Sequence, residues 1–196
     1  MTERPANLEA RLREIRACTI CADHLVDGVR PVLQAHESAR ILIAGQAPGR
    51  RVHESGVPFD DPSGDRLRDW MGIDSATFYD ATKIAIVPMG FCFPGSGKSG
   101  DLAPRRECAE AWRADLLTRL PSIQLTLVIG TYAMRWHLGP AAQKVTDTVK
   151  GWRQYLPAQL PLPHPSPRNN IWMRKNPWFG DEVLPVLRTR VLEVLR

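Results

Sequence analysis

The segment ARILIAGQAPG, residues 39–49, decides the fold of this chain. Residues 39–45 are mostly apolar and branched, which favours a strand buried on both faces, and the glycines and proline that follow favour a tight loop. A similar pattern recurs at KIAIVPMGF (83–91), at LTLVIG (125–130) and around 158–164. These segments predict four strands of one buried sheet.

Helical segments separate the predicted strands. We expect a helix over 63–73 with Ser63 as its N-cap, a helix over 105–120, a short helix opening at 131–136, and a last helix that begins near Asp181. Strands that alternate with helices predict a mainly parallel sheet with helices on both faces. Nothing in the sequence suggests a linker, so we expect one domain over residues 1–196.

The composition is that of a globular protein with a basic surface. Apolar residues make up 43% of the chain and charged residues 24%, and no apolar run approaches the ~20 residues of a membrane span. The formal net charge is +5, which favours an anionic partner. Since no targeting signal is apparent, we expect a cytoplasmic protein without a membrane partner.

The unusual loops all follow predicted strands. GQAPG follows the first strand, FCFPG the second, GTYA the third and HPSPRN the fourth. Ligands of open α/β sheets bind outside the carboxyl ends of the strands. We therefore expect one cleft that contains all four segments.

Four cysteines form a pattern of their own. Cys18 and Cys21 make a CxxC motif, which we expect in an amphipathic N-terminal helix, and Cys92 and Cys108 follow with fifteen residues between them. A disulfide framework is not expected in a chain of this length without a signal peptide. Four thiolates are the donor set of a [4Fe–4S] cluster or of a tetrahedral Zn²⁺. The remaining interpretation is four unrelated buried cysteines.

Taken together, these motifs resemble the uracil-DNA glycosylase superfamily. The order CxxC, strand, GQAPG, SGVPF, strand, Cys-x15-Cys, strand with GTYA, and HPSPRN is similar to its iron–sulfur members, families 4 and 5, over roughly residues 15 to 170. HPSPRN is closer to the single-strand-selective monofunctional branch. The resemblance implies a three-layer α/β/α fold with a central four-stranded sheet, and a structural [4Fe–4S] cluster on Cys18, Cys21, Cys92 and Cys108.

The resemblance also assigns roles in base excision, which requires a base flipped out of the stack. Phe59 matches the aromatic residue on which the flipped uracil stacks. His164 matches the histidine that donates a hydrogen bond to uracil O2 as negative charge develops. Pro48 and Gly49 bring backbone amides close to the base and the DNA.

The resemblance gives roles to the remaining motif residues as well. Gln46 and Ala47 face the pocket, Ser166 lies in a rigid turn that grips the DNA backbone, and Arg168 and Asn169 reach into the minor groove or fill the vacated stack. Arg50 and Arg51 are candidates for phosphate contacts, or ordinary solvated arginines.

Two departures from the family pattern bear on the chemistry. Gln46 stands where family 4 has glutamate, and Ala47 stands where other branches have Asp or Asn. An amide orients water but cannot take its proton, so Asp60 and Asp61 are alternative candidates for positioning the attacking water. Of these two aspartates we favour Asp61, and Gln46 stays a candidate as well. Residues 87–90 also lack the asparagine with which family 4 reads uracil, which leaves uracil specificity open.

The sequence thus predicts a monomeric, monofunctional glycosylase that hydrolyses the N-glycosidic bond of uracil, or of a related deaminated base, in DNA and leaves an abasic site. Two alternatives stay open. One is a binding module for damaged bases or abasic sites without turnover; the other is a zinc protein that shares only the fold.

Overall fold

A parallel sheet forms the centre of the molecule in the computed structural model, which describes residues 7–98, 100–142 and 144–196. Its strands lie in the order β2–β1–β5–β6 and every pair is parallel: β1 (Ile41–Ala44), β2 (Ile84–Ile86), β5 (Leu125–Ile129) and β6 (Gln159–Leu162). Each strand lies inside a predicted segment, so the predicted four-stranded sheet is confirmed. Beyond β2 the N–H groups of Val87 and Met89 still donate to the carbonyls of Ile43 and Gly45 at 3.0 and 2.9 Å.

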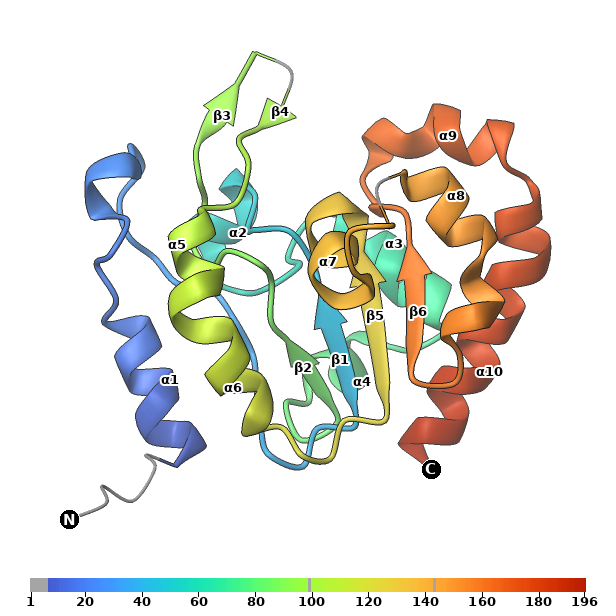
Figure 1. The fold of residues 1–196 in the computed structure, drawn as a ribbon, viewed down its shortest axis with the longest axis horizontal. Helices are drawn as coiled ribbons and strands as arrows, with labels where there is room; N and C mark the ends of the chain where they lie inside the picture. The colour runs from blue at the N-terminus through green and yellow to red at the C-terminus, as the bar shows by residue number, and fades with distance from the viewer. Residues whose placement is uncertain (1–6, 99, 143) are drawn as a thin grey trace.

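Helices cover both faces of the sheet and complete a three-layer α/β/α fold (Figure 1). Behind the sheet in that view lie α3 (Pro62–Met71), α4 (Ser75–Tyr79) and α10 (Leu184–Leu195); in front lie α6 (Ala114–Thr118), α7 (Gly130–Leu138) and α8 (Val145–Lys150), with α1 (Leu8–Arg16) beside α6. The remaining α-helices are α2 (Arg50–Ser55), α5 (Arg106–Cys108) and α9 (Asn170–Lys175). There are also 3₁₀ turns at Ala22–His24, Trp152–Tyr155 and Pro167–Asn169, and π-helical turns at Ala109–Arg113 and Phe179–Val183.

The core has two parts because β1 is buried on both faces. Ile43 packs with Leu67 of α3 in the larger cluster, whereas Leu42 packs with Ile15 of α1 and Leu116 of α6 in the smaller one. Full burial of such a side chain stabilises a fold by about 1.5–3 kcal/mol. The N-terminal helix is therefore part of the core.

The predicted N-cap of α3 is wrong. Asp61 holds that position, where its Oδ1 accepts a hydrogen bond from the Gly64 N–H at 2.9 Å, and Pro62 occupies the first helical turn. Proline fits there because its missing N–H would lack a partner within the helix. Ser63 therefore lies inside the helix and is buried.

The prediction that the CxxC motif lies in the N-terminal helix is also wrong. α1 ends at Arg16, and the N–H of Cys18 closes a tighter turn onto the carbonyl of Ile15. Cys21 then precedes the Ala22–His24 turn. The two cysteines thus lie in irregular chain after the helix.

The sequence did not predict the hairpin of β3 (Ser96–Gly97) and β4 (Gly100–Asp101), which stands above the sheet edge in Figure 1. The predicted helix over 105–120 is present as α5, a π-helical turn and α6. In the part of the chain that the structure describes, no helix combines the length and apolarity needed to cross a membrane.

Candidate active site

Two adjoining cavities lie at the carboxyl ends of the strands. The larger is about 650 Å³ and the smaller about 280 Å³. Both are lined by Gln46, Ala47, Pro48, Asp101, His164, Ser166 and Arg168. Pro94, Gly130 and Thr131 also line the larger one, so all four predicted loop segments reach one place.

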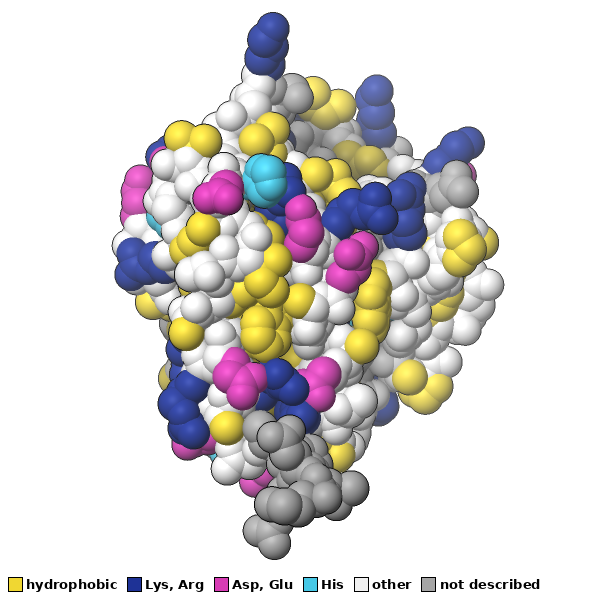
Figure 2. Space-filling view, turned by 60° about the vertical axis from the view of Figure 1, so that its left-hand side comes forward, with side chains coloured by type: hydrophobic (Ala, Val, Ile, Leu, Met, Phe, Trp, Pro, Cys, Tyr) yellow, Lys and Arg dark blue, Asp and Glu magenta, His cyan; other side chains and the backbone are white. Residues whose placement is uncertain are grey.

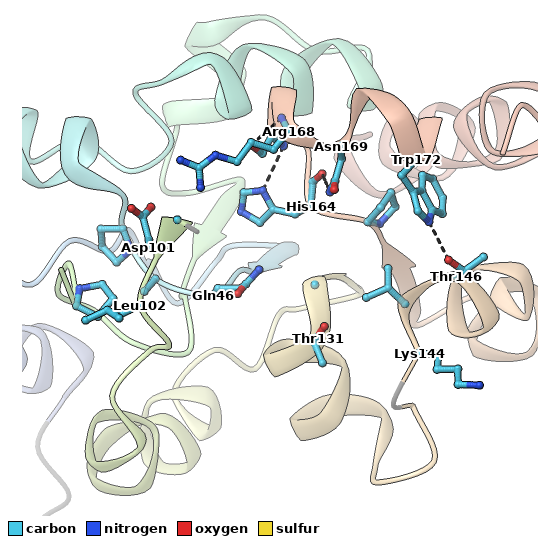
Figure 3. A pocket seen from close by; sticks show the side chains of 18 of the residues that line it. Gln46, Asp101, Leu102, Thr131, Lys144, Thr146, His164, Arg168, Asn169 and Trp172 are labelled. Atoms are coloured by element: carbon cyan, nitrogen blue, oxygen red, sulfur yellow. Dashed lines mark hydrogen bonds between the residues drawn. The ribbon is translucent and has the colours of Figure 1, made fainter. Parts of the chain in front are cut away.

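His164 lies between the two cavities at the end of β6 (Figure 3). Its Nδ1 accepts a hydrogen bond from the Ser166 N–H at 3.2 Å, and the Asn169 side chain donates to its carbonyl at 2.7 Å. Burial lowers the pKa of His164, against the opposing effect of Asp61 and Asp101. A neutral ring that accepts at Nδ1 carries its proton on Nε2, which makes that nitrogen a donor.

Phe59 is held in an unusual backbone conformation beside the smaller cavity. Its φ is +57°, in the left-handed region that bulky residues rarely adopt. Its ring packs edge-to-face on Phe78 with centroids 6.2 Å apart and lies close to Gly45. Gly64 makes room for this turn, because a Cβ there would lie 1.7 Å from the Phe59 carbonyl oxygen.

The first loop is tied to the segment that follows β2. The N–H groups of Met89 and Gly90 donate to the carbonyls of Gly45 and Gln46 at 2.9 and 2.8 Å. The Gln46 side chain lies against Gly130, where a Cβ would come within 2.8 Å of its Nε2. The loop is thus fixed by backbone contacts while its amide side chain lines both cavities.

A buried arginine holds the segment that follows β2 through its backbone carbonyls. Arg113 is fully buried and donates to the carbonyls of Val87 and Pro88, both at 2.9 Å, and to His137 Nε2 at 2.6 Å. Its guanidinium also lies 4.9 Å from the centroid of the Trp136 ring. Because burial lowers its pKa only to about 9, Arg113 is a cation at neutral pH.

The HPSPRN turn is fixed by short-range contacts. The Ser166 Oγ accepts from the Arg168 N–H at 3.3 Å, and Arg66 donates to the Ser166 carbonyl at 3.1 Å. The Arg168 guanidinium lies over Gly100, where a Cβ would come within 2.3 Å of its Nη1. The turn therefore rests against the β3–β4 hairpin.

The acidic residues divide into those that line the cavities and those that do not. Asp61 lines the smaller cavity with one oxygen bound to the Gly64 N–H, whereas Asp60 is absent from the described lining of both. Asp101 lines both cavities and was missed by the sequence analysis. The only signal for it was an acidic residue in a glycine-rich loop after the second strand.

Basic side chains surround this end of the molecule. Arg50, Arg51 and Arg168 line the smaller cavity and Lys144 the larger, and Figure 2 shows Lys and Arg side chains standing out toward the upper end of the face in view. Arg50 is already paired with Asp27 at 2.8 Å. The positive charge suits a polyanion in the cleft.

The four cysteines line one small cavity between α1, α5 and the loop after β2. Two of the sulfurs accept a hydrogen bond from an N–H group, both at 3.3 Å: Cys18 from Trp112 Nε1 and Cys108 from the Phe91 backbone. Burial raises the pKa of Cys108 to about 12. Among the described residues, no three Cys, His, Asp or Glu side chains form a group that could hold a single metal ion.

A sequence model of the uracil DNA glycosylase superfamily matches residues 33–188, which is most of the chain and includes the four loop segments at the carboxyl ends of the strands. The chain belongs to the uracil DNA glycosylase superfamily. Membership implies a DNA glycosylase, an enzyme that hydrolyses N-glycosidic bonds of bases in DNA. In this superfamily member, Cys18 and Cys21 lie ahead of the matched region and Cys92 and Cys108 within it.

Proposed function

We propose that the protein removes uracil, or a related deaminated base, from DNA by monofunctional hydrolysis and leaves an abasic site. The observation that carries this proposal is the pair formed by the Phe59 ring and the neutral His164, which line the same cavity on opposite segments of the cleft. One supplies a flat apolar surface for a flipped base, and the other supplies a hydrogen-bond donor.

The donor matters because the departing base carries the electrons of the broken bond. His164 Nε2–H would donate to the base oxygen as its negative charge develops, and such preorganised donors contribute about 10²–10³ in rate. A neutral imidazole is too weak an acid to transfer its proton to the departing nucleobase while the bond breaks. The base therefore leaves as an anion held by a hydrogen bond.

A monofunctional reaction is supported by the lining of the smaller cavity. A glycosylase that also cleaves the strand needs an amine to form a Schiff base with the sugar. No lysine is among the described residues that line this cavity. Water is therefore the proposed nucleophile, with Gln46 and Asp61 as the residues that the sequence analysis assigned to position it.

Base selection would depend on groups outside residues 87–90. That segment has no amide side chain, and Arg113 already binds the carbonyls of Val87 and Pro88. The amide of Gln46 lines both cavities and offers a donor and an acceptor to a pyrimidine edge. We propose Gln46 as the residue that reads the base.

We further propose that Cys18, Cys21, Cys92 and Cys108 hold a [4Fe–4S] cluster. A tetrahedral Zn²⁺ needs four sulfurs about 2.3 Å from one point, whereas a cluster presents a separate iron to each cysteine. The four cysteines line one cavity, which brings the donors of such a group together from three places in the chain. The N–H donors to the sulfurs of Cys18 and Cys108 suit thiolates. When bound, the cluster would hold the N-terminal segment against the loop after β2.

A base-release assay tests the proposal. Uracil-containing duplexes with U·G or U·A pairs and a uracil-containing single strand are incubated with excess protein, and free base and abasic sites are measured. Release of uracil with an intact strand until alkaline treatment is the expected result. If the protein binds these substrates but releases uracil from none of them, the proposed function is wrong and the protein is a damaged-base binding module.

A further inference from the structure

The first loop of the cleft has no group that can take a proton from water. Gln46 is an amide and Ala47 is apolar. Asp61 is a carboxylate, but its Oδ1 accepts the Gly64 N–H that begins α3. Protonation of Asp61 during catalysis would weaken this helix cap, so a second carboxylate is better suited to the task.

Asp101 is that second carboxylate. It lines both cavities, as His164 does, and Figure 3 shows Asp101, His164 and Gln46 around the same hollow. Its Oδ2 lies 3.3 Å from the position a Cβ would take on Gly49 of the first loop. Its Oδ1 has one long contact, 3.4 Å to the Ser96 Oγ, and the side chain is exposed to water.

The hairpin fixes the position of Asp101. Ser96 pairs with Asp101 and Gly97 with Gly100, and the Leu102 N–H donates to the Gly95 carbonyl at 2.8 Å. Gly100 has a φ of +139°, which a residue with a side chain would rarely adopt. The turn thus delivers a carboxylate from the loop after β2 into the cleft.

We propose that Asp101 is the catalytic base of the excision reaction, an inference that rests on the proposed function. The carboxylate accepts a hydrogen bond from the attacking water. As the bond from sugar C1′ to the base nitrogen breaks, its electron pair leaves with the base and the water oxygen bonds to C1′. The water proton passes to Asp101, which later returns it to solvent. Arg168 lies over Gly100 beside this carboxylate, and a DNA phosphate would draw the guanidinium away.

The alternative is that Asp101 only holds Arg168 in place. The two roles differ in a double-mutant cycle, since a residue that only holds Arg168 has no effect on the rate once Arg168 is removed. The charged and titratable groups around Asp101 include Arg168, His164 and Asp61 across the cleft, Arg50 and Arg51 after Gly49, and Lys98 at the hairpin turn. Because Asp101 opposes the lowering of the His164 pKa, the comparison is made at pH 7.5, where His164 is neutral with or without Asp101.

Single-turnover base release from uracil DNA at pH 7.5, in wild-type and Arg168→Ala backgrounds, tests the proposal. Asp101→Asn is expected to lower the rate by about 10²-fold or more in both backgrounds, and to leave DNA affinity within about threefold of the matching background. Asp101→Glu should restore part of the rate. Asp69→Asn, an equal charge change on the exposed face of α3, is the control and should behave as wild type.

Three results would overturn the assignment. They are an Asp101→Asn rate within about threefold of wild type, a rate loss that disappears in the Arg168→Ala background, or a loss in Asp61→Asn that Asp101→Asn does not share. A wild-type protein that releases no base would instead refute the proposed function itself, and the Asp101 assignment with it.

Discussion

Acidification should destabilise this protein through one partly buried histidine. His137 accepts a hydrogen bond from Arg113 through Nε2 at 2.6 Å, and burial, reinforced by the Arg113 charge, lowers its pKa from 6.5 to about 3. Protonation in the folded state would place two cations in contact. The unfolded chain meets no such penalty and binds a proton below pH 6.5, so stability falls as the pH drops from 6.5 toward 3.

The size of the effect follows from the pKa difference. Each pH unit below 6.5 costs roughly 1.36 kcal/mol until the folded-state pKa is reached, which gives about 2 kcal/mol at pH 5. Because His164 also has a lowered pKa, the total loss includes more than one histidine. A variant that removes only the His137 titration therefore isolates its share.

His137→Gln is that variant, because a glutamine oxygen can still accept from Arg113 and does not titrate. Denaturant unfolding at pH 7.5 and at pH 5.0 gives the free energy of unfolding for both proteins. Wild type should lose about 2 kcal/mol more than His137→Gln between the two pH values. Equal losses would show that His137 is not held neutral by Arg113, and would refute the reasoning.

Three further predictions concern the site. Gly64→Ala places a methyl 1.7 Å from the Phe59 carbonyl oxygen and should lower the thermal midpoint of unfolding by roughly 3–10 °C. Gly180→Ala is the control, because a Cβ there meets nothing within 4 Å and should leave the midpoint unchanged. Equal midpoints for the two variants would contradict this prediction. Cys92→Ala should remove absorbance near 400 nm and lower stability, and a colourless, iron-free wild type that contains zinc would contradict the cluster. His164→Ala should reduce single-turnover base release by about 10²–10³-fold, with DNA affinity that still falls steeply with salt; an unchanged rate would remove its role as donor.

The strands and the cleft could be predicted because they depend on runs of residues. Apolar segments such as 125–130 have few alternatives to a buried strand, and parallel strands bring the loops after them to one edge. Those two facts suffice to place His164 near Gln46. The cysteine spacing similarly pointed to one site before any contact was known.

Features that depend on a single contact could not be predicted in this way. The hairpin has two-residue strands, so nothing in GSGKSGD indicated that Asp101 would enter the cleft. Arg113 resembles any surface arginine in AEAWRADLL, and only the packed structure shows it fully buried. Ser63 and Asp61 are both good N-caps, and Pro62 decides between them by occupying the first turn.

The place of α1 in the smaller core cluster has a consequence for how the limits of this domain are drawn. The superfamily match begins at residue 33, yet Ile15 of α1 packs in the same cluster as Leu42 of the central sheet. A fragment trimmed to the matched region would keep most of the lining of both cavities, but it would remove α1, Cys18 and Cys21 and cut α10 short after residue 188. The stable unit is therefore larger than the region that defines the family, and expression of this protein should start ahead of α1.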